Sequence, residues 1–242
     1  MPAKAVAREV LVDFDGTIAC DDPTDRLFER FADPFWRVIE KAWQEGRISS
    51  RECMRRQVEL LRVSPKALDE QIQHVRIDPG FDPFLQFCRR HSAEVKIVSD
   101  GFDRVVGAVL ASAGLDVPFF ANKLEWQGGD RWRLAFPHGS RSCRVDAANC
   151  KCSHARSPCQ HPWAVVGDGR SDFCMAGRAE HVVAKGSLAD FCRHRGLPHA
   201  TFADFHDVTE ALSAWLLREN WVAVPSSKPS YPRGSSGREE RR

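Results

Sequence analysis

Three short apolar runs that each end in a polar motif limit the fold of this chain more than any other feature. The runs are residues 9–12, 95–98 and 164–167, and the motifs after them begin at Asp13, Ser99 and Asp168. Such runs are typical of buried parallel strands, and a fourth candidate is 181–184. Helical apolar spacing occurs between and after them, at 82–91, 103–113, 187–195 and 207–219. The alternation predicts an α/β fold built on a Rossmann-like, doubly wound parallel sheet.

Residues 21–78 interrupt this alternation with helical patterns, which predicts an all-helical cap inserted after the first strand. The core then comprises residues 1–20 and 79–221, including a hairpin near 117–136. The remaining residues, 222–242, are rich in Pro, Ser and Gly and are expected to form a disordered tail. The cap carries an aromatic-rich stripe that we expect to pack inside: Leu27, Phe28, Phe31, Phe35, Val38, Ile39 and Trp43.

The overall composition argues against several classes of function. A net charge of only +2 gives no broad electrostatic attraction to nucleic acid or membranes. Neither a secretory signal pattern nor an apolar run of about 18 residues is present, and nine scattered cysteines favour reduced thiols. We therefore expect a cytoplasmic protein that binds neither nucleic acid nor membranes. The sequence leaves the oligomeric state open.

The segment Asp13-Phe14-Asp15-Gly16-Thr17 is the strongest chemical signal. Two carboxylates at the end of a strand point toward the same opening at the edge of the sheet. There, one carboxylate can attack phosphorus and the other can transfer protons. Gly16 lets the turn present backbone N–H groups to a phosphate. The alternative is a solvated turn with two surface acids, because short motifs also occur by chance.

Later motifs add the other groups that phosphoryl transfer needs. Ser99 and the amide of Gly101 can bind phosphoryl oxygens, and Lys151 can neutralise their charge. Asp168 and Asp172 offer the hard oxygen ligands that suit Mg²⁺. Together these residues predict a magnesium-dependent phosphatase.

DFDGT, VSDG, a lysine and GDGRSD, in this order, resemble the haloacid dehalogenase superfamily over residues 10–208. The helical cap is similar to that of its phosphoserine-phosphatase-like group, and WQEGRISSRECMRRQ resembles its methionine-salvage phosphatase branch. This second resemblance implies that the substrate is a small phosphorylated metabolite. The resemblance implies that Asp13 is the nucleophile and a Mg²⁺ ligand, and that Asp15 is the acid/base, with its carbonyl on the metal. It further implies that Ser99 and Lys151 hold the phosphoryl group and that Asp168 binds Mg²⁺. Asp172 would orient a metal-bound water or contact the metal ligands without touching the metal itself.

Two positions depart from that pattern. Ser171 stands where many relatives have Asn, and the lysine region reads Asn149-Cys150-Lys151-Cys152. We choose Lys151 because it precedes Asp168 by 168 − 151 = 17 residues; Lys123 and Lys185 are weaker alternatives.

Asp22, at the entry to the cap, has two interpretations. Acidic residues near this place hold the substrate ammonium in amino-acid-phosphate relatives, so Asp22 is a candidate for substrate binding. It is equally suited to cap a helix beside Pro23.

A cluster of thiols and imidazoles follows: Cys150, Cys152, His154, Cys159 and His161. These are zinc ligands, but their spacing is not that of a standard finger, so a structural Zn²⁺ at Cys150, Cys152 and Cys159 is a minor alternative.

Two rivals to hydrolysis remain open at this stage. The chain could transfer phosphate to an acceptor other than water, or it could be a catalytically silent binding protein on the same scaffold. The sequence does not choose among a methylthio-sugar phosphate, phosphoserine and a phosphorylated amine.

Overall fold

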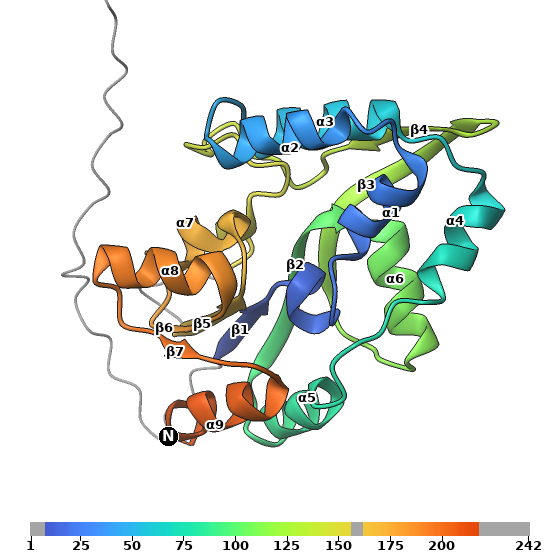
Figure 1. The fold of residues 1–242 in the computed structure, drawn as a ribbon. Coiled ribbons are helices and arrows are strands. Elements are labelled where there is room, and N and C mark those ends of the chain that lie inside the picture. The colour runs from blue at the N-terminus through green and yellow to red at the C-terminus, as the bar shows by residue number, and fades with distance from the viewer. Residues whose placement is uncertain (1–7, 156–161, 218–242) are drawn as a thin grey trace, which may run out of the picture.

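A seven-stranded sheet forms the centre of the molecule, with helices on both faces and a helical cap above one edge (Figure 1). The computed structural model describes residues 8–155 and 162–217. The strands are β1 (Glu9–Val12), β2 (Glu94–Phe102), β3 (Phe119–Gly128), β4 (Arg131–Ala135), β5 (Trp163–Gly167), β6 (His181–Ala184) and β7 (Ala200–Thr201). Their order is β4-β3-β2-β1-β5-β6-β7, and only the β3–β4 pair is antiparallel. The predicted doubly wound α/β fold is confirmed.

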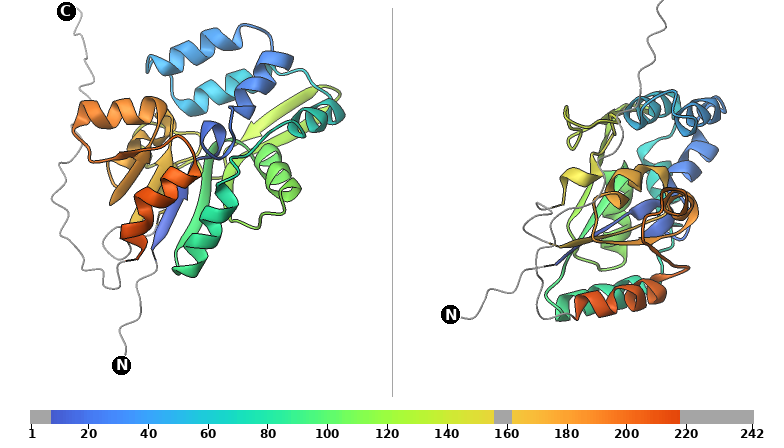
Figure 2. Two further views of the ribbon diagram at one scale, coloured as in Figure 1. Left: turned by 60° about the horizontal axis from the view of Figure 1, so that its bottom comes forward. Right: turned by 90° about the vertical axis from the view of Figure 1, so that its left-hand side faces the viewer.

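The core helices occupy the segments predicted for them, within a few residues. They are α5 (Phe81–Arg90), α6 (Asp103–Ser112), α8 (Gly186–Arg195) and α9 (Phe205–Leu216), with a short α7 (Phe173–Ala176) before β6. Alternate residues of β1 serve the two faces of the sheet. Val10 and Val12 join the apolar cluster that includes α5, α6 and α9, whereas Leu11 joins the cluster under α7 and α8. Helices cover both faces of the sheet (Figure 2), which is why the last three residues of β1 are all apolar.

The cap consists of four helices between β1 and α5. They are α1 (Pro23–Phe31), α2 (Trp36–Gln44), α3 (Ser50–Leu60) and α4 (Pro65–Ile72). The two chain segments that join cap and core run side by side, since Ala19 forms a β-bridge with Ile77 and the amide of Cys20 donates to the carbonyl of Arg76. Cap boundaries at residues 21 and 78 remain a prediction.

The predicted hairpin, β3 and β4, extends from the sheet and supports the cap (Figure 1). Its turn contains Gly128 and Gly129 at φ of 100° and 60°, which side-chain-bearing residues rarely adopt. The indole Nε1 of Trp132 donates to the carbonyl of Val63 over 2.8 Å, and the amide of Val63 donates to Asp130. The hairpin therefore fixes the connection between α3 and α4.

The expected packing of the aromatic stripe is only partly correct. Leu27, Phe28 and Ile39 are buried, but Phe35 and Val38 are 56% and 55% exposed. The stripe is wider than the contact that four short helices offer, so its outer edge meets solvent.

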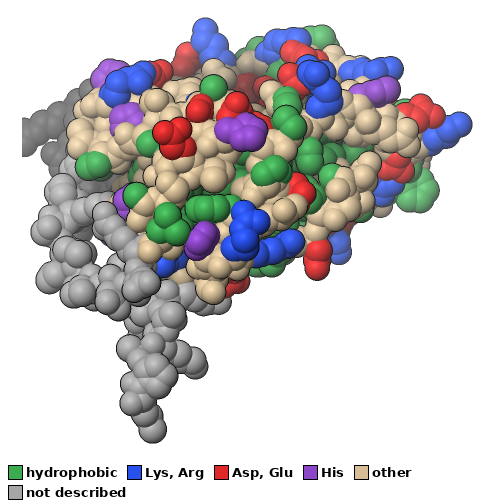
Figure 3. Space-filling model, turned by 90° about the horizontal axis from the view of Figure 1, so that it is seen from below, with side chains coloured by type: hydrophobic (Ala, Val, Ile, Leu, Met, Phe, Trp, Pro, Cys, Tyr) green, Lys and Arg blue, Asp and Glu red, His purple; other side chains and the backbone are tan. Residues whose placement is uncertain are grey.

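Figure 3 shows the molecular surface on the side where α5 and α9 lie, and charged side chains of both signs are interspersed on it. Within the two described ranges, none of the helices has both the length and the apolarity that crossing a membrane requires. The tail at 222–242 lies outside the described residues.

Candidate active site

Asp13 lies directly beyond β1, at the carboxyl edge of the sheet and between β2 and β5. Its backbone amide still donates to Val166 of β5, which anchors the residue in line with the sheet. Its side chain is 6% exposed, and Oδ1 accepts from the Phe14 amide at 2.7 Å. The pKa of Asp13 is raised well above its ordinary value, mainly by burial and secondly by the negative charge of Asp172.

Asp15 is held by hydrogen bonds to both of its side-chain oxygens. The hydroxyl of Thr24 donates to Oδ1 and that of Ser99 donates to Oδ2, each over 2.8 Å. The Gly101 amide in turn donates to the Ser99 hydroxyl at 2.8 Å. A Cβ on Gly101 would stand 2.6 Å from Asp15 Oδ2, so glycine is required for this approach. Ser99 and Gly101, predicted to hold phosphate, thus also orient Asp15.

Lys151 is buried and its ammonium joins two carboxylates. Nζ lies 2.7 Å from Asp13 Oδ1 and 2.8 Å from Asp172 Oδ1. Burial opposes the charged ammonium, but Asp13, Asp172 and Asp100 outweigh it and raise the pKa of Lys151. It therefore stays charged at any physiological pH.

The two alternative lysines lie in other surroundings. Lys123 is on the hairpin, where it pairs with Glu125 and its side chain is 60% exposed. Lys185 lies over the ring of Phe202. The geometry favours Lys151 over both.

Asp168 follows β5 and faces Asp13 across the turn at Gly16. Thr17 Oγ1 donates to Asp168 Oδ1 at 2.9 Å. Gly16 has φ of +67°, and a Cβ there would come within 2.7 Å of Asp168 Oδ2. Burial, then the charge of Asp172, raises the pKa of Asp168 to about 6.

One oxygen from each of Asp13, Asp168 and Asp172 lies within 4.8 Å of the others. Lys151 forms ion pairs with two of these three carboxylates, and the raised pKa values of Asp13 and Asp168 indicate that negative charge is in excess. A hard divalent cation with oxygen ligands fits this arrangement. Asp172 is fully buried and uses its oxygens on Lys151 and, at 3.3 Å, on the Gly169 amide, so it lies behind the other two.

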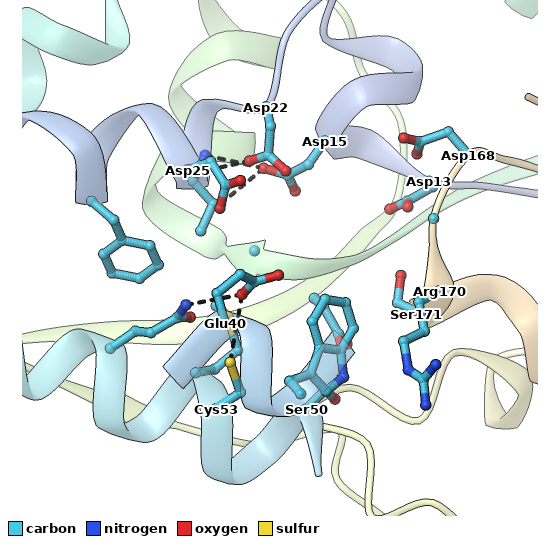
Figure 4. Close-up of a pocket in the computed structure, with 18 residues that line it drawn as sticks. Asp13, Asp15, Asp22, Asp25, Glu40, Ser50, Cys53, Asp168, Arg170 and Ser171 are labelled. Carbon is cyan, nitrogen blue, oxygen red and sulfur yellow. Dashed lines mark hydrogen bonds between the residues drawn. The ribbon is translucent and has the colours of Figure 1, made fainter. Parts of the chain in front are cut away.

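A cavity of about 140 Å³ separates these carboxylates from the cap (Figure 4). Its lining comes from core and cap and includes Asp13, Asp15, Asp168 and Arg170 on one side and Asp22, Asp25, Phe28, Glu40, Trp43 and Met54 on the other. Asp22 lines the cavity and also caps α1, since its Oδ1 accepts from the Asp25 amide at 2.8 Å. Both interpretations of Asp22 are therefore compatible with its position.

The side of the cavity that the cap forms is called its roof here. Two acids of the roof, Asp25 and Glu40, were not identified from the sequence. Glu40 accepts from Gln57 Nε2 at 2.9 Å and from the thiol of Cys53 at 3.6 Å. Burial, then the charges of Glu40 and Asp15, raises the pKa of Asp25 to about 7. Only the packing of α1 against α2 and α3 brings these side chains together, so no local sequence signal could have identified them.

Asn149 is a second residue that the motifs did not identify. Its amide group donates to the carbonyls of Ser99 and Phe120, both over 2.9 Å, and its backbone amide donates to Asp100 Oδ1. These bonds fix the segment that carries Lys151 onto the ends of β2 and β3. Its proximity to Lys151 in sequence was the available signal.

The described members of the cysteine and histidine cluster, Cys150, Cys152 and His154, give no support to the zinc alternative. Cys159 and His161 lie outside the described residues. Among residues 8–155 and 162–217, the cysteines do not join any group of three close ligand atoms; the group found is the aspartate triad. Cys150 and Cys152 have their sulfurs 3.8 Å apart, and His154 contacts Asn149 Oδ1.

Two bacterial phosphatases are similar to this chain over most of their length. A "2-hydroxy-3-keto-5-methylthiopentenyl-1-phosphate phosphatase" of Brevibacillus brevis is 33% identical, with 83% of this chain and 92% of the relative covered. One of the same name from Geobacillus kaustophilus is 32% identical, with 83% and 93% covered.

Solved structures of phosphoserine phosphatases share the fold. One described as a phospho-aspartyl intermediate analogue matches with a TM-score of 0.62 at 22% identity, covering 86% of this chain and 99% of that one. A substrate-bound complex matches equally well at 20% identity. In addition, residues 10–177 match the family model of haloacid dehalogenase-like hydrolases. With this match and the identity to the Brevibacillus relative, the chain belongs to the haloacid dehalogenase-like hydrolase family.

Proposed function

We propose that this chain is a phosphatase that cleaves a phosphomonoester by attack of Asp13 on phosphorus. The observation that carries the proposal is the position of the Asp13 carboxylate, which lines the cavity while Lys151 holds its Oδ1 at 2.7 Å. With one oxygen fixed, the other is oriented for attack, and a carboxylate nucleophile gives an aspartyl-phosphate.

Asp15 acts as the acid and then the base. It protonates the leaving oxygen of the ester and later removes a proton from the water that hydrolyses the aspartyl-phosphate. Hydrogen bonds from Thr24 and Ser99 support this role, because they hold the carboxyl group in one orientation at the cavity wall.

Lys151 and Asp172 act as a pair. Lys151 balances negative charge beside the nucleophile and, with Ser99 and Gly101, contributes positive potential to the bound phosphoryl group. The contact of its ammonium with Asp172 supports this assignment, because it keeps the lysine side chain from rotating away from Asp13.

Mg²⁺ is the cofactor that fits the carboxylates, held by Asp13, Asp168 and the carbonyl of Asp15, with Asp172 behind them. When bound, it would neutralise phosphoryl charge. The excess of carboxylates over lysine supports this part of the proposal.

The substrate we propose is a small phosphorylated metabolite of the type named for the two bacterial relatives, a methylthio-substituted hydroxy-keto-pentenyl phosphate. Phe28, Trp43 and Met54 line the cavity on the cap side and can accept an apolar thioether end. A phosphorylated amine is the second candidate, because Asp22, Asp25 and Glu40 line the same side and could pair with an ammonium. Action in the cytoplasm stays a prediction.

The test is phosphate release from a panel of both substrate types, with Mg²⁺ or with a chelator, by the wild type and by Asp13→Asn. We expect turnover with Mg²⁺, background with the chelator, and background for Asp13→Asn. Addition of short alcohols distinguishes transfer from hydrolysis, because a transferase would form alkyl phosphates. A wild type that releases no phosphate from the whole panel would favour the silent scaffold and reject the proposal.

A further inference from the structure

Two cysteines flank the buried Lys151, and their thiols face each other. The Sγ atoms of Cys150 and Cys152 are 3.8 Å apart across the short turn η2 (Lys151–Ser153). Cys150 is buried at 4% exposure, whereas Cys152 is partly exposed. A disulfide needs two sulfurs at about 2 Å, so the pair can close by a local movement of this turn.

The surroundings of the two thiols give them different pKa values and therefore different reactivity. Arg178 Nη1 lies 3.3 Å from Cys152 Sγ. A hydrogen bond from Cys174, together with the charge of Arg178, lowers the pKa of Cys152 to about 6. Burial, then the negative charge of Cys152, raises the pKa of Cys150 to about 12. Cys152 is thus a partly accessible thiolate beside a protonated neighbour, and the thiolate is the reactive form.

We propose that Cys150 and Cys152 are a thiol oxidation site, at which Cys152 reacts first and Cys150 closes a reversible disulfide around Lys151. With hydrogen peroxide as oxidant, the Cys152 sulfur attacks one peroxide oxygen, the O–O bond breaks, and the leaving hydroxide takes a proton to become water. The Cys150 sulfur then attacks the Cys152 sulfenic acid, the S–O bond breaks, and the thiol proton leaves with hydroxide as a second water. Two electrons pass from the thiols to the peroxide.

Formation of the sulfenic acid favours its own second step. It removes the negative charge of Cys152 that helps to keep Cys150 protonated. The buried position of Cys150 also keeps it from competing for the peroxide in the first step.

Closure of the disulfide would move the residue between the two cysteines. The amide of Ser153 donates to Cys150 O at 2.8 Å, so the turn that carries Lys151 is compact and a change at both its flanking side chains alters it. Lys151 Nζ would then lose its position between Asp13 and Asp172. This consequence rests on the proposed function; the oxidation site itself does not.

The experiment is disulfide mapping of the full chain after treatment with hydrogen peroxide, followed by tryptic digestion. Trypsin cleaves after Lys151, so the expected disulfide links peptides 145–151 and 152–156, and dithiothreitol separates them. A disulfide from Cys152 to Cys174 or Cys159 instead would overturn the proposal, as would thiols that are unreactive because they hold stoichiometric zinc.

Activity is read in parallel on the same samples. We expect peroxide to reduce phosphate release by about tenfold or more, and dithiothreitol to restore it, because the electrostatic groups of such sites are worth roughly this much or more. Cys152→Ser and Cys150→Ser should lose this response, whereas Cys20→Ser, an exposed thiol at the entry to the cap, should keep it. A mapped disulfide in a chain that releases no phosphate at all would reject the proposed function and leave the oxidation site standing. An unchanged rate in an active, fully disulfide-bonded sample would reject the effect on Lys151.

Discussion

The carboxyl edge of the sheet and the roof of the cavity differ in how their functional residues are brought together. At the sheet edge, Asp13 and Asp168 directly follow β1 and β5, Ser99 lies in the second half of β2, and the parallel pairing of β1 with β2 and β5 aligns the three. In the roof, Asp25 and Glu40 belong to two separate helices, and tertiary packing alone makes them neighbours. Local sequence motifs therefore encode the residues at the sheet edge, whereas no local motif encodes those in the roof.

The two regions also differ in electrostatic compensation. Lys151 and the amides of Phe14 and Gly169 bind the carboxylates at the sheet edge. In the roof, burial and the charges of Glu40, Asp15 and Glu29 disfavour the ionised form of Asp25, and the charge of Arg37 favours it only weakly. Substitutions at the edge should therefore change rates, and substitutions in the roof should change stability and selectivity.

The largest effect is expected for Lys151→Met. Without the ammonium, Asp13 and Asp172 would be buried and unpaired, so kcat should fall roughly 10²- to 10³-fold and the free energy of unfolding by about 3 kcal/mol. Steady-state kinetics and urea unfolding measure both. Lys123→Met is the matched control, and because Lys123 is exposed it should change stability by no more than about 0.5 kcal/mol. Equal effects of the two substitutions would contradict the assignment.

Gly101→Ala should have the next largest effect. The added Cβ would stand 2.6 Å from Asp15 Oδ2 and 2.8 Å from Thr24 Oγ1, so Asp15 must move. A displacement of this size should lower kcat by roughly 10- to 100-fold with the fold retained. Gly107→Ala on α6 tests a similar change away from the edge, where the Cβ would meet the ring of Phe119 at 3.3 Å. Wild-type kcat in Gly101→Ala would show that Asp15 needs no fixed position.

Much of this edge could be predicted, and the reasons are local. A buried β-branched run followed by Asp13 or Asp168 needs no tertiary information, and four strands and four core helices were placed by such patterns. The bond from Ser99 to Asp15 could not be foreseen, because it depends on the register that pairs Val12 with Ile97. The exposure of Phe35 was missed because an amphipathic stripe does not reveal how wide its partner surface is.

In the roof, Asp25→Asn should stabilise the protein in a pH-dependent way. The folded protein raises the pKa of Asp25 from 3.8 to about 7, so the folded state binds this proton more tightly than the unfolded chain does. The wild type therefore loses stability as pH rises from about 4 to 7, and the loss stays constant above that range. Asparagine has no charge to bury, so the variant should be more stable than the wild type at pH 8 and much less so at pH 4.5. The full pKa shift corresponds to roughly 4 kcal/mol, and we expect about 2 kcal/mol at pH 8 because Asp25 is partly exposed.

Urea unfolding at the two pH values measures this gain. Asp33→Asn, at an exposed position in the same cap, is the control and should change the free energy of unfolding by no more than about 0.5 kcal/mol at either pH. A gain for Asp25→Asn that is equal at both pH values would contradict the electrostatic account of the roof.

The smallest effect is expected where the hairpin supports the cap. Trp132→Phe removes the donor to the carbonyl of Val63 and should lower the free energy of unfolding by about 1 kcal/mol, with kcat within about twofold of wild type. Trp126→Phe, whose side chain is 56% exposed, should change stability less. The two variants are compared by thermal unfolding. A large loss of kcat in Trp132→Phe would show that the hairpin takes part in the chemistry.

The most direct test of the central claim is to trap the phosphorylated enzyme and locate the phosphate. The full chain is mixed with substrate and Mg²⁺, quenched in acid within one turnover, and reduced with borohydride, which converts an aspartyl-phosphate to homoserine. Fragment masses of the tryptic peptide 9–26 then identify the residue. We predict homoserine at position 13 in the wild type and none in Asp13→Asn. Homoserine at position 15, or phosphate release without any phosphorylated enzyme, would contradict attack by Asp13.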